Sequence, residues 1–307
     1  MKSSRLRRTK VFALSFGVSL VILSLIFIPI MLEISPLKDS YLPSSSETPS
    51  EVTNTYAPTG KDAMTALVVV TESGIGRYFL LVRFDPVNRR IPITSLPYTM
   101  KVVTSERTDT LAGYDIYGGT LLVKEVLEAV FDIPIDRTAR LSSDAFIKSL
   151  NTLGSVKYTL PYTLVYKDTA SDTYINVPKG NQTLDGRSVY DMFRFPQYAE
   201  GEEHRYKVQS DLLAKLLNQR VDDWLVKHGD SVFNTLVGLA ETDISYNDYR
   251  QRQSALSSFA QLEGDVSIPV FVSGEYSTQS FGITQQSVDT VHMYFAPEQK
   301  QENTDAA

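Results

Sequence analysis

The N-terminal stretch from Val11 to Leu32 carries no charged side chain, and five Lys or Arg residues precede it within residues 1–10. A helix of roughly 20 apolar residues can cross a bilayer, and a cationic flank stays on the cytoplasmic side. The pattern predicts an uncleaved transmembrane signal anchor at 11–32, a cytoplasmic tail before it and an extracellular remainder. A cleaved secretory signal is the alternative. Its apolar region is only about 7 to 15 residues long and ends at a small-residue site, which this stretch lacks.

The next part of the chain reads as a linker. Residues 33–63 are rich in Ser, Thr and Pro and poor in large apolar side chains. Such a stretch cannot bury enough surface to offset its ordering entropy, so we interpret it as a disordered tether. The folded domain is expected at 64–296, followed by a polar, disordered tail at 297–307. An apolar fraction of 42% is enough for a domain of this length to bury a normal core.

Composition narrows the possible functions. The chain has no cysteine, so disulfides, thiolate metal sites and a Cys nucleophile are absent. A net charge of −6 argues against a nucleic-acid partner, whereas the N-terminal cations suit the anionic lipids of a bilayer. The three His residues lack zinc-site spacing, and no G-x-S-x-G, Walker A or dinucleotide motif occurs.

Strand-like and helix-like runs alternate after the tether. Runs of β-branched and aromatic residues predict three opening strands at 66–71, 78–85 and 91–97. Interleaved strands and helices predict a layered α/β domain with a mixed central sheet flanked by helices. The further predicted elements are helices at 118–133, 144–154, 204–228, 231–239, 246–262 and 285–295, a strand pair within 155–168 and a strand at 266–272.

One predicted helix places polar residues on its apolar face. Arg205, Gln209, Leu212 and Leu216 follow one another at helical spacing, so they share a face. A polar pair therefore points where the core is expected. An inward Arg is costly unless it is paired or faces a ligand, and its forked donors suit phosphate oxygens.

Two interpretations of this stretch stay open. Arg194, Arg205 and Gln209 beside a helix N-terminus would form an anion site. Alternatively, they belong to an ordinary surface helix start, where the helix dipole favours Glu202 and Glu203.

These residues resemble the LytR-CpsA-Psr family of bacterial cell-envelope proteins. The segment Leu184–Gly186, Arg194, and the spacing of Glu202, Arg205 and Gln209 are similar to its late signature. Residues 117–156 are similar to its Gly-Gly helix and the strand and helix that follow. The resemblance spans roughly residues 64–296. It implies a single extracellular α/β domain on a transmembrane anchor.

The resemblance also implies an activity. Family members bind a polyprenyl-linked (pyro)phosphate, hold its lipid chain in an apolar tunnel, and transfer a glycopolymer such as teichoic acid to peptidoglycan. It implies that Arg194 and Arg205 are catalytic. It also implies that the substrate is contacted by Arg194, Glu202, Arg205 and Gln209. Such phosphoryl transfer depends mainly on positioning and on neutralising oxygens with Arg and Mg²⁺, the cofactor that the resemblance implies.

Two strand positions depart from the family pattern. The family has Asp-Thr at the start of one strand and S-I-P-R-D at the end of the next, which supply two metal-binding carboxylates and a catalytic Arg. The matching places here read Arg77-Tyr78 and Ser95-Leu96-Pro97-Tyr98-Thr99. Mg²⁺ is usually held by at least one carboxylate, so we assign no metal ligand.

Arg77 places a fixed positive charge where the family has metal ligands. We hypothesise that Arg77, together with Arg194 and Arg205, binds a lipid phosphate without Mg²⁺. The alternative is an eroded site in which Arg77 is an exposed strand residue.

Three classes of function remain open. The first is a transferase, and the second is a non-catalytic protein that binds the lipid-linked precursor or acts as a scaffold in wall assembly. Both require an apolar tunnel. The third is an adhesive domain without a lipid site. It predicts that the strand positions Leu80, Val82, Ile91 and Ile93 close into a filled core.

Overall fold

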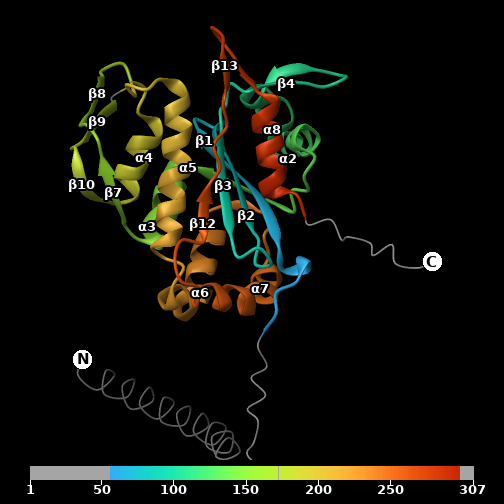
Figure 1. Cartoon of the computed structure of the whole chain (residues 1–307). Helices are drawn as coiled ribbons and strands as arrows, with labels where there is room; N and C mark the ends of the chain where they lie inside the picture. Colours follow the sequence, from blue (N-terminus) through green and yellow to red (C-terminus); the bar gives the residue numbers. More distant parts are fainter. Residues whose placement is uncertain (1–55, 172, 298–307) are drawn as a thin grey trace, which may run out of the picture. The chain divides into compact units, whose positions relative to one another are not determined.

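The computed structural model describes residues 56–171 and 173–297. The predicted anchor at 11–32, the residues before it, most of the tether and residues 298–307 lie outside this part of the chain. A six-stranded mixed sheet forms the centre of the domain, in the order β11-β6-β1-β2-β3-β12 (Figure 1). Its strands are β1 (Met64–Glu72), β2 (Ile75–Phe84), β3 (Ile91–Leu96), β6 (Arg137–Ser142), β11 (Glu241–Thr242) and β12 (Ser267–Pro269).

The sheet combines antiparallel and parallel pairing, which confirms the predicted α/β class with a mixed sheet. β1, β2 and β3 form an antiparallel meander, while β6 runs parallel to β1 and β12 parallel to β3. Leu67 and Val69 of β1 pack into one core, whereas Val68 and Val70 pack into another. The sheet is therefore covered on both faces. That is why its opening strands read as nearly continuous apolar runs.

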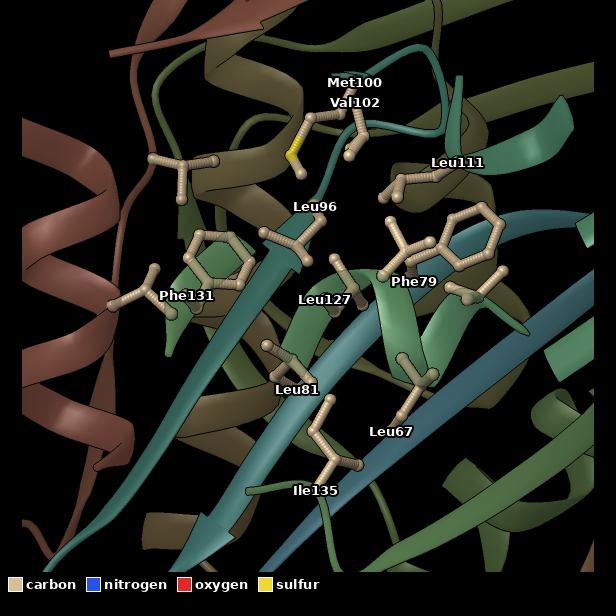
Figure 2. Packing of buried hydrophobic residues seen from close by; sticks show 14 of the residues in the cluster. Leu67, Phe79, Leu81, Leu96, Met100, Val102, Leu111, Leu127, Phe131 and Ile135 are labelled. Atoms are coloured by element: carbon tan, nitrogen blue, oxygen red, sulfur yellow. The ribbon is translucent and has the colours of Figure 1, made fainter. Parts of the chain in front are cut away.

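Helices α2 (Leu111–Phe131) and α8 (Gln285–Phe295) cover one face of the sheet (Figure 1). Figure 2 shows Phe79 and Leu81 from β2 packing with Leu127 and Phe131 from α2. Helix α2 is interrupted at Gly119, whose φ of 69° lies in the left-handed region that glycine tolerates. The helix predicted at 118–133 is the part of α2 that follows this break.

The other face carries α3 (Ser143–Leu153), α4 (Gly186–Arg194) and α5 (Glu202–Asn218). Helices α6 (Asp223–Gly238) and α7 (Tyr246–Phe259) lie at one end of the sheet (Figure 1). Four small hairpins and a short turn complete the described domain. They are β4 (Lys101–Val103) with β5 (Thr108–Thr110), β7 (Val156–Leu160) with β10 (Gly180–Leu184), β8 (Leu164–Asp168) with β9 (Thr173–Val177), β13 (Gly274–Tyr276) with β14 (Phe281–Ile283), and the 3₁₀ turn η1 (Gly60–Asp62).

The single helix predicted at 204–228 was wrong, because α5 ends at Asn218. The Asn218 side chain donates to the Ser267 carbonyl and accepts from the Val266 and Ser267 amides, so it holds β12 in place. Asp222 then starts α6 by accepting hydrogen bonds from the Trp224 and Leu225 amides. An Asp at this position is a common N-cap, and it is the signal that the apolar spacing hid.

Two strand predictions also need correction. The strands within 155–168 do not pair with each other, because β7 pairs with β10 and β8 with β9. The β8–β9 hairpin is thus inserted between the two strands of a second hairpin. The strand predicted at 266–272 is shorter, since β12 contains only Ser267–Pro269. Within residues 56–171 and 173–297, no helix is long and apolar enough to span a membrane.

Candidate functional site

The residues predicted to bind phosphate lie near one end of the central strands, where β1 and β3 end and β2 begins. This end of the sheet is called the polar edge below. Arg77 is the third residue of β2, and α5, which carries Arg205 and Gln209, begins at Glu202. Ser95 near the end of β3 ties α5 to the sheet. Its amide donates to Ser210 Oγ at 2.9 Å, and its hydroxyl donates to Gln209 Oε1 at 2.5 Å. These bonds fix the start of α5 beside the sheet edge.

Arg205 and Gln209 point inward, and they bond to the backbone that links α4 to α5. Arg205 Nε donates to the Phe195 carbonyl at 3.1 Å, and its Nη2 donates to Glu202 Oε2 at 2.8 Å. Gln209 is fully buried, and its Nε2 donates to the Phe193 carbonyl at 2.9 Å. Buried carbonyls need donors, so the link between the helices is a sufficient reason for this polar pair.

Helix α4 is held in place by a close approach to α3. The Gly186 amide donates to Asn151 Oδ1 at 2.8 Å, and a Cβ at this glycine would lie 2.4 Å from the Ile147 carbonyl oxygen. Any other residue would push the two helices apart. Asp185 caps α4 by accepting a hydrogen bond from the Ser188 amide. The Leu-Asp-Gly segment therefore has a structural role that positions Arg194 at the end of α4.

Arg194 contacts a different set of groups from Arg205. Its Nε donates to Asp191 Oδ1 at 3.0 Å, and its Nη1 donates to Thr173 Oγ1 on β9 at 3.4 Å. Its guanidinium carbon also lies 5.7 Å from the centre of the Tyr190 ring. The structure thus brings Arg194 to the polar edge through α4, while the side chain of Arg205 is committed to the α4–α5 link.

Arg77 stacks on Tyr98, so the two departures from the family pattern contact each other. The guanidinium carbon of Arg77 lies 3.6 Å from the centre of the Tyr98 ring, within the range of a cation–π contact. The Arg77 side chain is 37% exposed, compared with 10% for Arg205. Arg77 is therefore the more accessible of these two cations to a ligand.

Glu72 connects these groups, and no sequence pattern indicates its role. It accepts hydrogen bonds from the Tyr78 hydroxyl at 3.0 Å and the Tyr190 hydroxyl at 2.6 Å, and it lies 3.9 Å from Arg77 Nε. Burial first, and Glu72 second, raise the pKa of both tyrosines, so both phenols remain protonated donors. A continuous series of contacts thus runs from Tyr98 through Arg77, Glu72 and Tyr190 to Arg194.

Each of the three predicted arginines has a carboxylate partner. The site is therefore balanced in charge, and a phosphate would have to compete with, or displace, a carboxylate. Burial raises the pKa of Asp191 although Arg194 and Arg187 lower it, which shows that its charged form is poorly solvated. The pairs are Arg77–Glu72 at 3.9 Å, Arg194–Asp191 at 2.9 Å and Arg205–Glu202 at 2.8 Å.

The carboxylates at this edge do not fit the Mg²⁺ that the family resemblance implies. Glu72 accepts from two phenols, and Asp191 and Glu202 are each paired with an arginine. Within the described residues, no group of three or more His, Cys, Asp or Glu side chains is arranged to hold a metal ion. Mg²⁺ usually needs carboxylates that are free to bind it, so we derive no chemical step from it.

An apolar cavity of about 440 Å³ lies between the sheet and helices α3, α5, α6 and α7. Its walls include Leu80 and Val82 from β2, Ile93 from β3, and Phe146 from α3. Tilted and edge-to-face aromatic rings pack between the cavity and the polar edge. Phe146 lies 5.4 Å from Phe193, and Phe193 lies 5.6 Å from Tyr78, whose hydroxyl reaches Glu72.

This cavity bears on the adhesive interpretation of the sequence. The adhesive interpretation required the apolar strand positions to close into a filled core, but Leu80, Val82 and Ile93 line the cavity. Ile91 instead packs with Phe259 from α7. A volume of this size lies in the range of small-molecule and lipid sites.

The chain belongs to the LytR_cpsA_psr family, whose model matches residues 72–305. Among curated proteins it is 24% identical over 172 residues to the Bacillus subtilis polyisoprenyl-teichoic acid–peptidoglycan teichoic acid transferase TagT, which covers 55% of this chain and 53% of TagT. It is also 23% identical over 201 residues to TagV from Bacillus subtilis, a transferase with the same description. This match covers 63% of this chain and 51% of TagV. The chain therefore spans about half the length of these two relatives.

Solved structures share the fold. The crystal structure of Bacillus subtilis TagV superposes with a TM-score of 0.61 at 20% identity, covering 76% of this chain and 95% of TagV. A protein from Eubacterium siraeum superposes with a TM-score of 0.73 at 15% identity, covering 84% of this chain and 98% of the other. At these identities, the likeness establishes the architecture alone.

Proposed function

We propose that this is a single-pass membrane protein of the bacterial cell envelope that binds a polyprenyl-linked (pyro)phosphate glycopolymer precursor. The observation that carries the proposal is the apolar cavity of about 440 Å³ beside the sheet. Its lining is almost entirely aliphatic and aromatic, so it suits a hydrocarbon chain and offers a polar ligand few hydrogen bonds. The cavity lies on the face of the sheet that also carries α4 and α5, and therefore Arg194 and Arg205, which suits a ligand with an apolar tail and an anionic head.

The membrane anchor rests on the sequence alone. The uncharged run at 11–32, with its cationic flank, supports a helix that crosses the cell membrane once and leaves the C-terminal domain extracellular. The partners in this proposal are the lipid bilayer, the lipid-linked precursor and peptidoglycan.

Arg77 and Arg194 are the best candidates to hold the phosphate. Both have exposed guanidinium surface, at 37% and 19% of the side chain, and both lie in the series of contacts around Glu72. Arg205 and Gln209 would contribute by holding the α4–α5 link, from which the edge of the site is built. The proposed catalytic role of Arg205 therefore needs a test that separates chemistry from folding.

Two candidate activities follow from the binding proposal. The printed names of TagT and TagV describe transfer of teichoic acid to peptidoglycan, which supports a glycopolymer phosphotransferase. The second candidate is a non-catalytic lipid-phosphate binder or scaffold in wall assembly. It is favoured by the pairing of each of the three arginines with a carboxylate and by the lack of free metal-binding carboxylates at this edge.

The test is to measure binding and turnover of a polyprenyl pyrophosphate by the full chain in detergent, with Mg²⁺ or with EDTA. Arg194→Ala is the test variant, and Arg187→Ala is its matched control. Arg187 pairs with the same Asp191 from the same helix, but its side chain is 56% exposed. We expect binding in EDTA that Arg194→Ala weakens and Arg187→Ala preserves.

The two activities give different results in this experiment. Turnover that disappears in Arg194→Ala would establish a transferase, whereas binding without turnover would establish a binder. Loss of binding in EDTA would refute the idea that arginines replace the metal. Absence of binding under every condition would refute the proposed function itself.

A further inference from the structure

Helix α6 lies at the end of the domain where the chain arrives from its N-terminal part. At this tether-proximal end, Arg252 of α7 donates to the carbonyls of Lys61 at 3.5 Å and Ala63 at 3.2 Å, immediately before β1 begins. Figure 1 shows α6 and α7 together at this end of the sheet. Any membrane anchor that precedes residue 56 would therefore be attached at the end occupied by α6.

The same helix forms part of the wall of the apolar cavity. Phe233, Leu236 and Val237 of α6 line the cavity. At 3.6 residues per turn, Trp224 and Lys227 fall on the opposite side of the helix from these residues. Helix α6 thus separates the cavity from whatever lies outside it.

The outer side of α6 carries the features of a helix that lies at a lipid surface. Trp224 is partly exposed, and its ring stacks on His228 with a centroid distance of 5.0 Å, with the Arg220 guanidinium carbon 4.8 Å from the ring centre. Tryptophan favours the boundary between lipid and water, because its ring is apolar and its N–H is polar.

The charges here indicate what kind of contact this surface makes. Lys227 and Arg250 are exposed, but so are Asp222 and Asp230. The mixed signs do not match a strongly charged protein partner. They are compatible with a contact that the Trp224 ring makes at a lipid surface, which screening by salt weakens little.

We propose that α6 lies on the outer surface of the membrane, with Trp224 at the lipid–water boundary, so that the cavity behind it lies next to the bilayer. The inference rests on the proposed membrane anchor. The 23 residues at 33–55 can span at most roughly 80 Å even when fully extended, which keeps the domain within reach of the bilayer. A lipid chain then passes between the bilayer and the cavity over a short distance without crossing open water.

The test uses the fact that Trp224 is the only tryptophan in the chain. The full-length protein is reconstituted into vesicles of phosphatidylcholine and phosphatidylglycerol, with brominated or unbrominated acyl chains. Bromine quenches only a tryptophan that lies close to the chains. We expect Trp224 emission to be lower in brominated than in unbrominated vesicles. Circular dichroism of the same samples checks that the domain is folded in both.

A second tryptophan position serves as the control. Tyr117 on α2 is 70% exposed and belongs to the part of α2 before the Gly119 break, on the far side of the sheet from the cavity. In the double variant Trp224→Phe with Tyr117→Trp, the emission should be equal in the two kinds of vesicle. Quenching at position 117 and none at position 224 would overturn the proposal.

The possible failures are distinguishable. Vesicle flotation reports the anchor independently of fluorescence, so a protein that floats with an unquenched Trp224 overturns this inference and leaves the proposed function standing. A protein that does not float overturns both the anchor and this inference. A concentration-dependent change in Trp224 emission without lipid, together with dimerisation in sedimentation, would show instead that α6 contacts a second copy of the chain.

Discussion

Truncating Arg205 to alanine should destabilise the folded domain whether or not this residue touches a substrate. The variant removes the donors to the Phe195 carbonyl at 3.1 Å, to Pro196 at 3.4 Å and to Glu202 at 2.8 Å. The Arg205 side chain is only 10% exposed, so water replaces these donors poorly. The segment that links α4 to α5 would then be held to α5 mainly by the hydrogen bond from Gln209 to the Phe193 carbonyl.

The cost follows from these contacts. A hydrogen bond from a charged donor contributes about 1.5–3 kcal/mol, and a buried carbonyl left without a donor costs about 1–3 kcal/mol. The bond to Pro196 is long, and the bond to Glu202 is partly screened, so they add little. We expect a loss of about 3 kcal/mol, which for a domain of this size lowers Tm by about 6–12 °C.

The assay is thermal unfolding of the full chain in detergent, followed by circular dichroism. Lys207→Ala is the matched control, because Lys207 lies on the same helix, is 40% exposed and pairs with Glu203 at 2.6 Å. Exposed pairs of this kind contribute about 0–1 kcal/mol. If Arg205→Ala had the same Tm as Lys207→Ala, the structural explanation for Arg205 would be refuted. Ligand binding would then be the remaining reason for its burial.

Three further predictions concern groups around the cavity and the site. A hydrogen bond from Arg137 to Asp248 holds the pKa of Asp248 well below its usual range. Asp248 therefore stabilises the fold above about pH 4, and this contribution is lost as the pH falls through the folded-state pKa. Asp248→Asn should lower stability by about 2–3 kcal/mol at pH 7, and urea titrations should show the difference shrinking in acid. Asp191→Asn frees Arg194 and should tighten binding of inorganic pyrophosphate about fivefold by calorimetry, on the order of 1 kcal/mol. Leu213→Phe fills part of the cavity, so it should weaken retention of a fluorescent polyprenyl phosphate while Tm stays within about 3 °C, since filling a void costs little.

The fold was predictable where local pattern and burial agree. The strands at 66–71 and 91–97 were found because both faces of the sheet are buried, which leaves few polar interruptions. The break between α5 and α6 was missed because apolar residues continue through it. Asn218 and Asp222 mark the break, but the role of Asn218 depends on β12, which lies far along the chain.

The site was predictable only in part, for a related reason. The helical spacing identified Arg205 and Gln209 as inward-pointing, because that follows from local geometry. Asp191 could have been found from its three-residue spacing to Arg194. Glu72 could not, because its bond to Tyr190 joins positions 118 residues apart in sequence. A single sequence carries no signal for such a pair.

The contact between Arg77 and Tyr98 changes how the departures from the family pattern are interpreted. Independent loss of a carboxylate and an arginine would leave two unrelated surface residues. Here the two positions meet, with the guanidinium carbon 3.6 Å from the ring centre. The resemblance implies that the family supplies the guanidinium from the end of the second strand, whereas this chain supplies one from β2 and orients it with the tyrosine that follows β3. On the alignment that the resemblance implies, a positive charge thus stands at this edge where the family has a metal-binding carboxylate. This combination favours phosphate binding by arginine over metal-assisted transfer, and it explains why binding and turnover must be measured separately.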